Sequence, residues 1–504
     1  MNDRLRRLKL NSVAGIIYQF SLVITGFILP RCFLRFYGSN VNGLISSISR
    51  FLSLINVCDM GIGAVVQSAL YKPLSDNNTA EISKVFLYSK KFFRKISYIL
   101  IFYVILLTLI YQKIADRNFT KEYTSTMILA MSISTFGQYF VGISCQLLLN
   151  ADQHRYIQLI VNTITLVANT AVSILLMYNG ATIQIVKLVT SVIYLLRPVF
   201  LFIYVSKHYI IDKTVKIDGD AVPEKKSAIT QHFAYMIYQN TDVIVLTFFS
   251  SYASISIYST YVLVTTGIKS FIDALLAGFE PLIGNLIATN EKDKLDLIFK
   301  EYNWLIHTIC VLLFSITGIL IVPFILIYTK GVTDADYNNP LFAKLITIAY
   351  FFDVIRNSLY AIIKAAGHYK MTQNASLAEA AINVIISIIL VFRFGITGVA
   401  IGTILAEMFF LAYEIVYLSK NIIFYSIKMQ IKQICLDFIT SVMCIVSCTL
   451  LKIQGTSYLA WAKSAIIVFL ICFIICLFMQ ILFCKSNVHM LINIAKMRTK
   501  NSKM

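Results

Sequence analysis

The sequence is short of charge, and of negative charge above all. Only 14% of its 504 residues are charged, with 25 Asp and Glu against 44 Lys and Arg, whereas 58% are hydrophobic. A soluble domain has about 25% charged and 45–50% apolar residues. The apolar surplus needs surroundings other than water, which excludes an ordinary soluble enzyme and indicates an integral membrane protein.

Catalytic motifs are also missing. The sequence contains no GxSxG nucleophile elbow, no Walker A loop and no HExxH helix. Its ten cysteines form no CxxC or Cys/His cluster, which predicts neither a metal site nor a disulfide framework. No long loop that could hold the active site of a membrane glycosyltransferase or polymerase interrupts the apolar segments. We therefore expect a protein that is not an enzyme and has no metal or other cofactor.

Long apolar segments fill most of the chain. A bilayer core of about 30 Å needs about 20 apolar residues of helix. The sequence predicts an all-α integral membrane protein with about fourteen transmembrane helices, near residues 12–33, 42–69, 96–112, 125–149, 157–177, 184–205, 233–249, 254–280, 303–328, 341–363, 374–393, 396–418, 433–451 and 460–483.

The basic residues predict the orientation of these helices. With Met1 in the cytoplasm, the inner segments hold 29 Lys and Arg, the outer segments hold 11, and four lie inside spans. Cytoplasmic loops carry the excess of basic residues in membrane proteins. We therefore expect a multi-pass membrane protein with both termini cytoplasmic. The same distribution explains the net charge of +19 without any partner nucleic acid.

Short segments recur at an offset of about 215 residues. Ala151–Tyr156 resembles Ala366–Met371, and Gly180 and Gly395 open two helices at the same offset. Such matches indicate a six-helix unit used twice. We predict an N-lobe at 1–210, a C-lobe at 211–425 and two extra helices with a cytoplasmic tail at 426–504. Two copies in the same orientation would enclose a central binding cavity.

Polar residues follow one face of the second predicted helix. They fall within a sector about 100° wide at 100° per residue, and they are Asn42, Ser46, Ser49, Ser53, Asn56, Gly63 and Gln67. Arg50 and Asp59 flank this stripe. Such a stripe is typical of a helix that lines a water-filled cavity. The alternative is hydrogen bonding between packed helices, which is common in membranes.

Three further helices carry charges that a membrane span ordinarily excludes. The eighth helix presents Tyr258, Tyr261, Lys269, Asp273 and Glu280 on one face. The tenth carries Asp353 and Arg356, and the seventh carries Asp242 with His232 near its cytoplasmic end. These residues are either binding and coupling residues or structural ion pairs, such as Lys269 with Asp273 and Asp353 with Arg356. Glu379 and Glu407 have no partner that the sequence identifies.

The N-terminal part of the chain resembles bacterial polysaccharide transporters. These are flippases of lipid-linked oligosaccharides in the multidrug/oligosaccharidyl-lipid/polysaccharide exporter superfamily. The detailed resemblance covers residues 11–75, and it rests on Ile28-Leu29-Pro30-Arg31, Tyr37-Gly38, Asn42-Gly43-Leu44, Phe51-Leu52-Ser53-Leu54, Asp59-Met60-Gly61-Ile62 and Leu70-Tyr71-Lys72-Pro73-Leu74. It implies a protein of a bacterial cytoplasmic (inner) membrane, with two six-helix lobes around a cavity that opens alternately to each side and with Arg31 contacting the diphosphate of an undecaprenyl carrier.

Together these observations predict a flippase for undecaprenyl-diphosphate-linked oligosaccharide repeat units, those of a capsule, O-antigen or exopolysaccharide. The candidate substrate-binding residues are Arg31, Arg50, Lys269, Arg356, Tyr258, Tyr261, Asn42, Ser53 and Asn56. The candidate coupling residues or structural ion pairs are Asp59, Asp242, Asp273 and Asp353. Transport could be coupled to H⁺, Na⁺ or the membrane potential. Expected partners are membrane lipids, a polymerase and other polysaccharide-assembly proteins.

Alternatives remain open within and outside transport. A peptidoglycan-precursor flippase and a cation-coupled multidrug exporter would share the predicted plan. The exporter would need a cavity dominated by carboxylates, whereas the second, eighth and tenth helices each carry a cation. A membrane glycosyltransferase or polymerase is disfavoured by the missing extramembrane loop.

Overall fold

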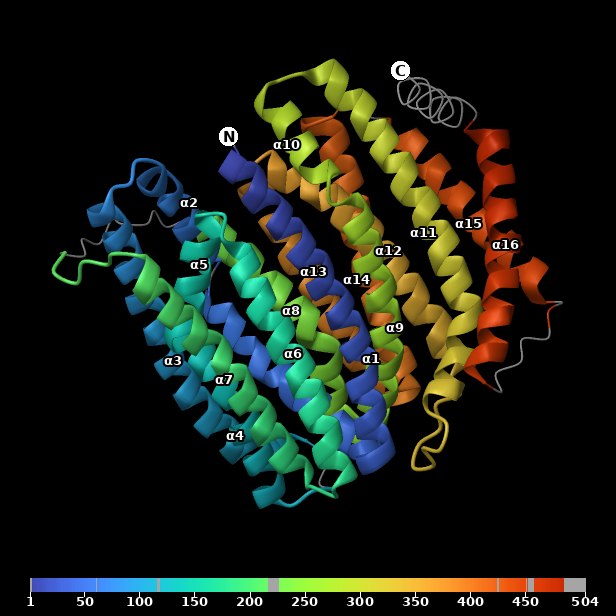
Figure 1. The fold of residues 1–504 in the computed structure, drawn as a ribbon. Helices are drawn as coiled ribbons and strands as arrows, with labels where there is room; N and C mark the ends of the chain where they lie inside the picture. The colour runs from blue at the N-terminus through green and yellow to red at the C-terminus, as the bar shows by residue number, and fades with distance from the viewer. Residues whose placement is uncertain are drawn as a thin grey trace. The chain divides into compact units, whose positions relative to one another are not determined.

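Helices joined by short connections make up the described structure, which is a computed structural model (Figure 1). It describes residues 2–59, 61–115, 118–215, 226–423, 426–449, 451 and 457–484, and no strand occurs among them. The chain divides into two compact units, Met1–Ser256 and Ile257–Met504. The predicted division into two lobes and an extra helix pair stays a prediction.

Among its described residues, the first unit contains eight complete helices, two short irregular turns and the start of a ninth helix. In chain order these are α1 (Asn2–Ser53), η1 (Leu54–Asp59), α2 (Ile62–Ser75), α3 (Thr79–Ile114), α4 (Lys121–Gly137), η2 (Gln138–Gly142), α5 (Ile143–Ala151), α6 (Arg155–Tyr178), α7 (Ile183–His208), α8 (Lys226–Phe249) and α9 (Tyr252–Leu276). The pairs α1–α6, α4–α7, α6–α7 and α3–α4 pack side by side.

The second unit contains most of α9 and all later helices. These are α10 (Phe279–Ala288), α11 (Lys292–Tyr328), α12 (Pro340–Ala365), α13 (Tyr369–Phe394), α14 (Ile396–Asn421), α15 (Ile427–Thr449) and α16 (Tyr458–Phe483). Its main packing pairs are α13–α14, α12–α14 and α11–α12. The last two helices pack on α11 through an apolar cluster that includes Val311, Leu320, Cys444 and Cys472.

The helices account for the predicted spans. Twelve helical stretches of the described residues are long and apolar enough to cross a membrane. One of them, Leu5–Asp59, holds the first predicted span and most of the second, which are separated where Gly38 leaves the helical conformation (φ 81°, ψ 180°). The polar helix α8 carries the seventh predicted span and is not among the twelve. The chain is therefore an all-α, multi-pass membrane protein of about fourteen helices, as predicted.

The second predicted helix is not continuous, so the prediction of one regular helix over 42–69 is wrong. α1 ends at Ser53 and gives way to the 3₁₀ turns of η1, and α2 begins after Gly61 in the left-handed conformation (φ 68°). A 3₁₀ segment has about three residues per turn rather than 3.6. The polar stripe therefore keeps one face only as far as Ser53. α9 likewise ends at Leu276, so Glu280 belongs to α10 and not to the face of Lys269.

The two repeated hexapeptides adopt the same backbone turn. Gln153 and Gly367 both have positive φ, 60° and 73°. Each is followed by a histidine whose amide donates a hydrogen bond five residues back, His154 to Leu149 O (2.8 Å) and His368 to Ile363 O (3.2 Å). This is the left-handed end of a helix that Gly adopts without strain. The sequence repeat thus corresponds to a structural repeat at these turns.

We predict that Gly43→Ala destabilises the protein, because a methyl group at Gly43 would lie 1.8 Å from the backbone oxygen of Tyr252. The backbone of α1 and the start of α9 must separate to admit it, and overpacking of this kind costs about 1–3 kcal/mol. Thermal unfolding of the purified protein in detergent measures the effect. Gly26→Ala is the control, since nothing lies within 4 Å of that position. Equal melting temperatures for the two variants would contradict the close approach.

Asp152 joins the N-terminal part of α1 to the turn before α6. Its carboxylate accepts hydrogen bonds from Tyr209 (2.6 Å) and His154 (3.0 Å) and lies 3.3 Å from Arg7 Nη1. Burial acts to raise the pKa of Asp152, but the hydrogen bonds from His154 and Tyr209 and the charges of His154 and Arg7 hold that pKa below its ordinary value.

The lowered pKa predicts a pH-dependent stability. A carboxylate with a depressed folded-state pKa stabilises the protein above its unfolded pKa of about 3.9 and loses this effect as the pH falls through the folded pKa. The melting temperature of the wild-type protein should therefore exceed that of the Asp152→Asn variant at pH 7, and this difference should become smaller at acidic pH. A difference in melting temperature that does not change with pH would show that the carboxylate charge is not responsible.

Candidate functional site

A buried cluster of charges occupies the second unit, on α9, α12, α13 and α14. Lys269 Nζ of α9 forms a salt bridge with Asp353 Oδ2 of α12. The other oxygen of Asp353 accepts a hydrogen bond from Asn357 Nδ2 (2.6 Å) and lies 3.2 Å from Arg356 Nη2. The predicted pair of Asp353 and Arg356 is therefore confirmed. Lys269 pairs with Asp353 and not with Asp273, whose side chain is exposed.

Arg356 is the centre of this cluster. Its Nε donates a hydrogen bond to Glu407 Oε2 of α14 (2.5 Å) and lies 3.5 Å from Glu379 Oε1 of α13. Its guanidinium lies over the ring of Phe410, 5.3 Å from the centroid. Arg356, Glu379 and Glu407 are 3%, 5% and 0% exposed. The sequence identified both glutamates as charges without a partner, and Arg356 is the partner of both.

Glu414 adds a carboxylate that sequence reasoning missed. It follows Glu407 by seven residues, two turns along α14, and interacts electrostatically with Arg356, Glu379 and Glu407. It is fully buried, and neither of its carboxylate oxygens has a hydrogen-bond partner among the described residues. The seven-residue spacing from Glu407 was the signal in the sequence that could have found it.

The cluster carries more negative than positive groups. Asp353, Glu379, Glu407 and Glu414 make four carboxylates against the two cations Lys269 and Arg356, so full ionisation would leave a formal charge of −2. An uncompensated buried charge costs several kcal/mol. The arrangement therefore favours protonation of one or two of these carboxylates, or binding of a cation, over full ionisation.

The two tyrosines that the sequence predicted on α9 lie near the opposite end of that helix from Lys269. Tyr261 is fully buried, and its hydroxyl donates a hydrogen bond to the backbone oxygen of Tyr337 (2.7 Å). Tyr258 is 5% exposed and packs on the ring of Phe342, with centroids 5.6 Å apart. Their predicted contact with sugars stays a prediction, and the structure assigns them packing contacts.

The polar side chains of the predicted stripe in the first unit form hydrogen bonds between helices. Asn42 Nδ2 donates to Ser256 (2.8 Å), and Ser53 donates to Asn240 of α8 (2.6 Å). Asn56 in η1 accepts from the hydroxyl of Tyr139 (2.7 Å). These contacts match the alternative that the sequence left open, hydrogen bonding between packed helices. Substrate binding by Asn42, Ser53 and Asn56 stays a prediction.

The other predicted charges of the first unit are half-buried. In α1, Arg31 lies before the kink at Gly38 and Arg50 lies after it. Asp59 lies at the end of η1, and Asp242 lies in α8. Arg50 forms no salt bridge with any carboxylate in the part of the chain that the structure describes. It is therefore a candidate cation for an anionic ligand, unlike Lys269 and Arg356.

A second polar network, which sequence reasoning missed, joins α11 to α15 and α16. His307 Nδ1 contacts the carboxylate of Asp437, and His307 and Asp437 are 0% and 2% exposed. Gln430 exchanges hydrogen bonds with Asn303 (3.0 and 3.2 Å), and Trp304 Nε1 donates to Gln480 (2.6 Å). Polar residues within apolar segments were the only signal in the sequence. The network anchors the last two helices to α11.

Solved structures share this fold over 82–95% of the chain. A structure described as lipid II flippase MurJ in an inward closed conformation matches 95% of this chain and 99% of its own, with a TM-score of 0.73 and 16% identity. An inward-facing multidrug resistance MATE family transporter of the MOP superfamily matches 82% of this chain and 97% of its own (TM-score 0.55, 13% identity). A MOP superfamily transporter from Pyrococcus furiosus matches 82% and 96% (TM-score 0.57, 11% identity).

These likenesses establish the fold. The chain has the architecture of the lipid II flippase and of the MATE transporters, so the resemblance to this superfamily is confirmed at the level of fold. No protein-family model and no curated protein matches the sequence.

We predict that Arg356→Met destabilises the protein by about 3–5 kcal/mol, because it leaves buried carboxylates without their cation. The double variant Arg356→Met/Glu407→Gln should lose less than the sum of the two single losses, since the residues are in contact. Lys344→Met, an exposed change on the same helix, is the control and should have little effect. Thermal unfolding in detergent measures all four. Strict additivity would contradict the pairing.

Proposed function

We propose that the protein is a flippase that moves an undecaprenyl-diphosphate-linked oligosaccharide from the inner to the outer leaflet of a bacterial cytoplasmic membrane. The observation that supports this proposal most is the share of the chain that matches the fold of a solved flippase. The likeness to the lipid II flippase covers 95% of the chain with a TM-score of 0.73, against 82% and 0.55 for a multidrug transporter.

The physical problem is the head of such a lipid. Sugars and a diphosphate cannot enter hydrocarbon without large desolvation costs, whereas the polyprenyl tail can remain in the bilayer. Polar and cationic groups along the transport path would replace the lost water. In our proposal Arg50 binds the diphosphate, because it is a half-buried cation without a salt bridge in the described residues. Arg31 has the same role by resemblance to the polysaccharide transporters.

Lys269 and Arg356 are proposed to act differently, because carboxylates neutralise both of them. A diphosphate would have to compete with Asp353 for Lys269 and with Glu407 for Arg356. Protonation of these carboxylates would weaken both salt bridges and release positive charge. The cluster would thus couple proton uptake to the affinity for an anionic head. The membrane potential could also contribute, at about 2.3 kcal/mol per charge per 100 mV.

Two observations favour other functions. The likeness to the lipid II flippase supports a peptidoglycan precursor as the substrate. The surplus of carboxylates around Lys269 and Arg356 removes the argument that α9 and α12 are too cationic for a cation-coupled multidrug exporter. The exporter remains less favoured because its fold covers less of the chain.

Depletion of the protein in its host tests the function and separates the candidates. We expect a lipid-linked oligosaccharide to accumulate on the cytoplasmic side, measured by extraction of lipid-linked intermediates and by their inaccessibility to an impermeant probe. Accumulation of the peptidoglycan precursor would instead support the second candidate. An unchanged lipid pool with altered drug sensitivity would overturn the flippase proposal.

Arg50→Ala should reduce flipping at least tenfold without loss of protein from the membrane. A hydrogen bond to a charged group contributes about 1.5–3 kcal/mol, which corresponds to one to two powers of ten. Transport of the lipid-linked substrate in reconstituted vesicles is the measurement. Arg35→Ala removes the same charge from an exposed position of α1 and is the matched control. Full activity of Arg50→Ala would exclude the proposed role.

A further inference from the structure

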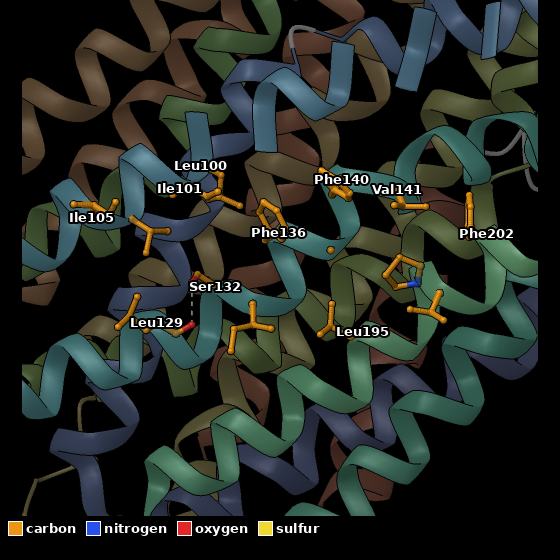
Figure 2. A pocket seen from close by; sticks show the side chains of 15 residues that line it. Leu100, Ile101, Ile105, Leu129, Ser132, Phe136, Phe140, Val141, Leu195 and Phe202 are labelled. Atoms are coloured by element: carbon orange, nitrogen blue, oxygen red, sulfur yellow. Dashed lines mark hydrogen bonds between the residues drawn. The ribbon is translucent and has the colours of Figure 1, made fainter. Parts of the chain in front are cut away.

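An apolar groove lies on the first unit, among α3, α4, η2 and α7. Its volume is about 580 Å³, within the range of about 300–1,000 Å³ that small ligands occupy. Figure 2 shows Ile105 and Leu129 toward one end and Phe140 and Phe202 toward the other. Ser132 is the only one of the fifteen lining residues with a polar side chain, and its hydroxyl donates to Leu129 O (2.9 Å). The groove therefore suits a hydrocarbon.

Local backbone features shape the groove. The turn η2 is π-helical, and π-helical turns are frequent at functional sites. Facing it, α7 contains Pro198, which cannot donate a backbone hydrogen bond within the helix. α4 and α7 approach closely at Gly137, where a methyl group would lie 2.2 Å from Leu195 Cδ2. α4 and α7 are thus tightly packed directly beside the groove. The groove therefore results from the irregular backbone at η2 and Pro198 and not from loose packing of the helices.

The groove opens toward lipid. Ile101, Ile105, Leu129, Val199 and Phe202 line it and are between 40% and 51% exposed. On the membrane-spanning helices of a multi-pass protein, exposed apolar side chains contact lipid chains. The groove thus meets the hydrocarbon of the bilayer, and lipid chains are the most abundant molecules there.

Two cations lie at the Phe140 and Phe202 end of the groove. Lys90 Nζ is 5.3 Å from the centroid of the Phe202 ring, and the guanidinium of Arg94 is 4.6 Å from that of Phe140. Neither cation forms a salt bridge within the described ranges, and Arg94 Nε is buried without a hydrogen-bond acceptor there. Lys213 adds a third positive charge close enough to act on Lys90. This end of the groove therefore favours an anion.

The length of the groove is close to the thickness of one leaflet of the bilayer, and the cations lie just beyond its end. From Leu129 to Val141 the lining runs twelve residues, about 18 Å at 1.5 Å per residue. Half of a hydrocarbon core of about 30 Å is about 15 Å. Arg94 precedes Leu100, the first lining residue of α3, by six residues, about 9 Å along the helix. A ligand with an anionic head and a chain one leaflet long would fit both parts.

We propose that this groove binds one acyl chain of an anionic phospholipid, whose phosphate is held by Lys90 and Arg94. A zwitterionic lipid would leave the two cations without full compensation. A polyprenyl tail is much longer than one leaflet and would exceed the groove. The excess of basic residues in 72–95 places this lipid in the cytoplasmic leaflet, where anionic lipids attract basic segments. The site is independent of the proposed transport path.

Lipid titration of the purified full-length protein tests the proposal by native mass spectrometry. We expect phosphatidylglycerol to bind about 30-fold more tightly than phosphatidylcholine with the same chains, since each basic residue contributes about 1 kcal/mol. Lys90→Gln/Arg94→Gln should lose this preference. Lys91→Gln/Lys95→Gln is the matched control, with the same charge change and spacing on exposed positions of α3, and should keep it.

Chain binding is tested separately. Val199→Trp fills the groove from an exposed position and should weaken phosphatidylglycerol binding at least tenfold. Dihexanoyl phosphatidylglycerol, which has the same head with short chains, should bind wild-type protein weakly. Unfolding temperatures within a few degrees of wild type establish that the variants fold, and the comparison of lipids on wild-type protein needs no variant.

Several results would overturn the proposal. One is equal affinity of the wild-type protein for the two phospholipids. Another is an equal loss of the preference for phosphatidylglycerol in Lys90→Gln/Arg94→Gln and in Lys91→Gln/Lys95→Gln. A third is unchanged binding of phosphatidylglycerol by Val199→Trp. Equal binding of the short-chain lipid would show a phosphate site without a chain site. Tighter binding of undecaprenyl phosphate than of phosphatidylglycerol, lost in Lys90→Gln/Arg94→Gln, would identify a different occupant.

Discussion

The salt bridges of Arg356 are the interaction on which the second unit depends. In a hydrocarbon surrounding, every charge has to be compensated inside the protein. Arg356 brings Asp353, Glu379 and Glu407 of three helices to one point, and Lys269 attaches α9 to the same cluster. Because the carboxylates outnumber the cations, the charge state of the cluster depends on protons or ions that reach it. The packing of α12, α13 and α14 and the charge of their core are therefore linked.

The two units satisfy the same constraint in different ways. The first unit uses mainly neutral hydrogen bonds between helices, such as Ser53 with Asn240 and Asn56 with Tyr139, and leaves Arg50 without a salt bridge among described residues. The second unit uses ion pairs and the network around His307. A neutral network is insensitive to proton concentration, whereas one rich in carboxylates is not. In the proposed function, the diphosphate therefore contacts a cation of the first unit, whereas proton uptake occurs at the carboxylates around Arg356 in the second.

Sequence patterns predicted the fold better than the site. Apolar length gave the spans, because the bilayer sets a single length that each helix must meet. Helical periodicity also placed Asp353 beside Arg356, three residues apart. It could not place Glu379 or Glu407 next to Arg356, since those contacts depend on the packing of separate helices. It failed at η1, where a 3₁₀ segment changes the phase of the side chains, and it paired Lys269 with a neighbour on its own helix instead of Asp353 on another.

The network between α11 and α15 has a consequence for how the protein is made. Asn303 and His307 hydrogen-bond to residues 127 and 130 positions later in the chain. At about 5–20 residues per second, α15 is synthesised roughly 6–26 s after α11. During that interval a tryptophan, an asparagine and a histidine of α11 lack their final partners. α11 must therefore be sheltered at the insertion machinery, or by other helices, until the end of the chain is complete, and a protein truncated before α15 would expose a polar face to lipid.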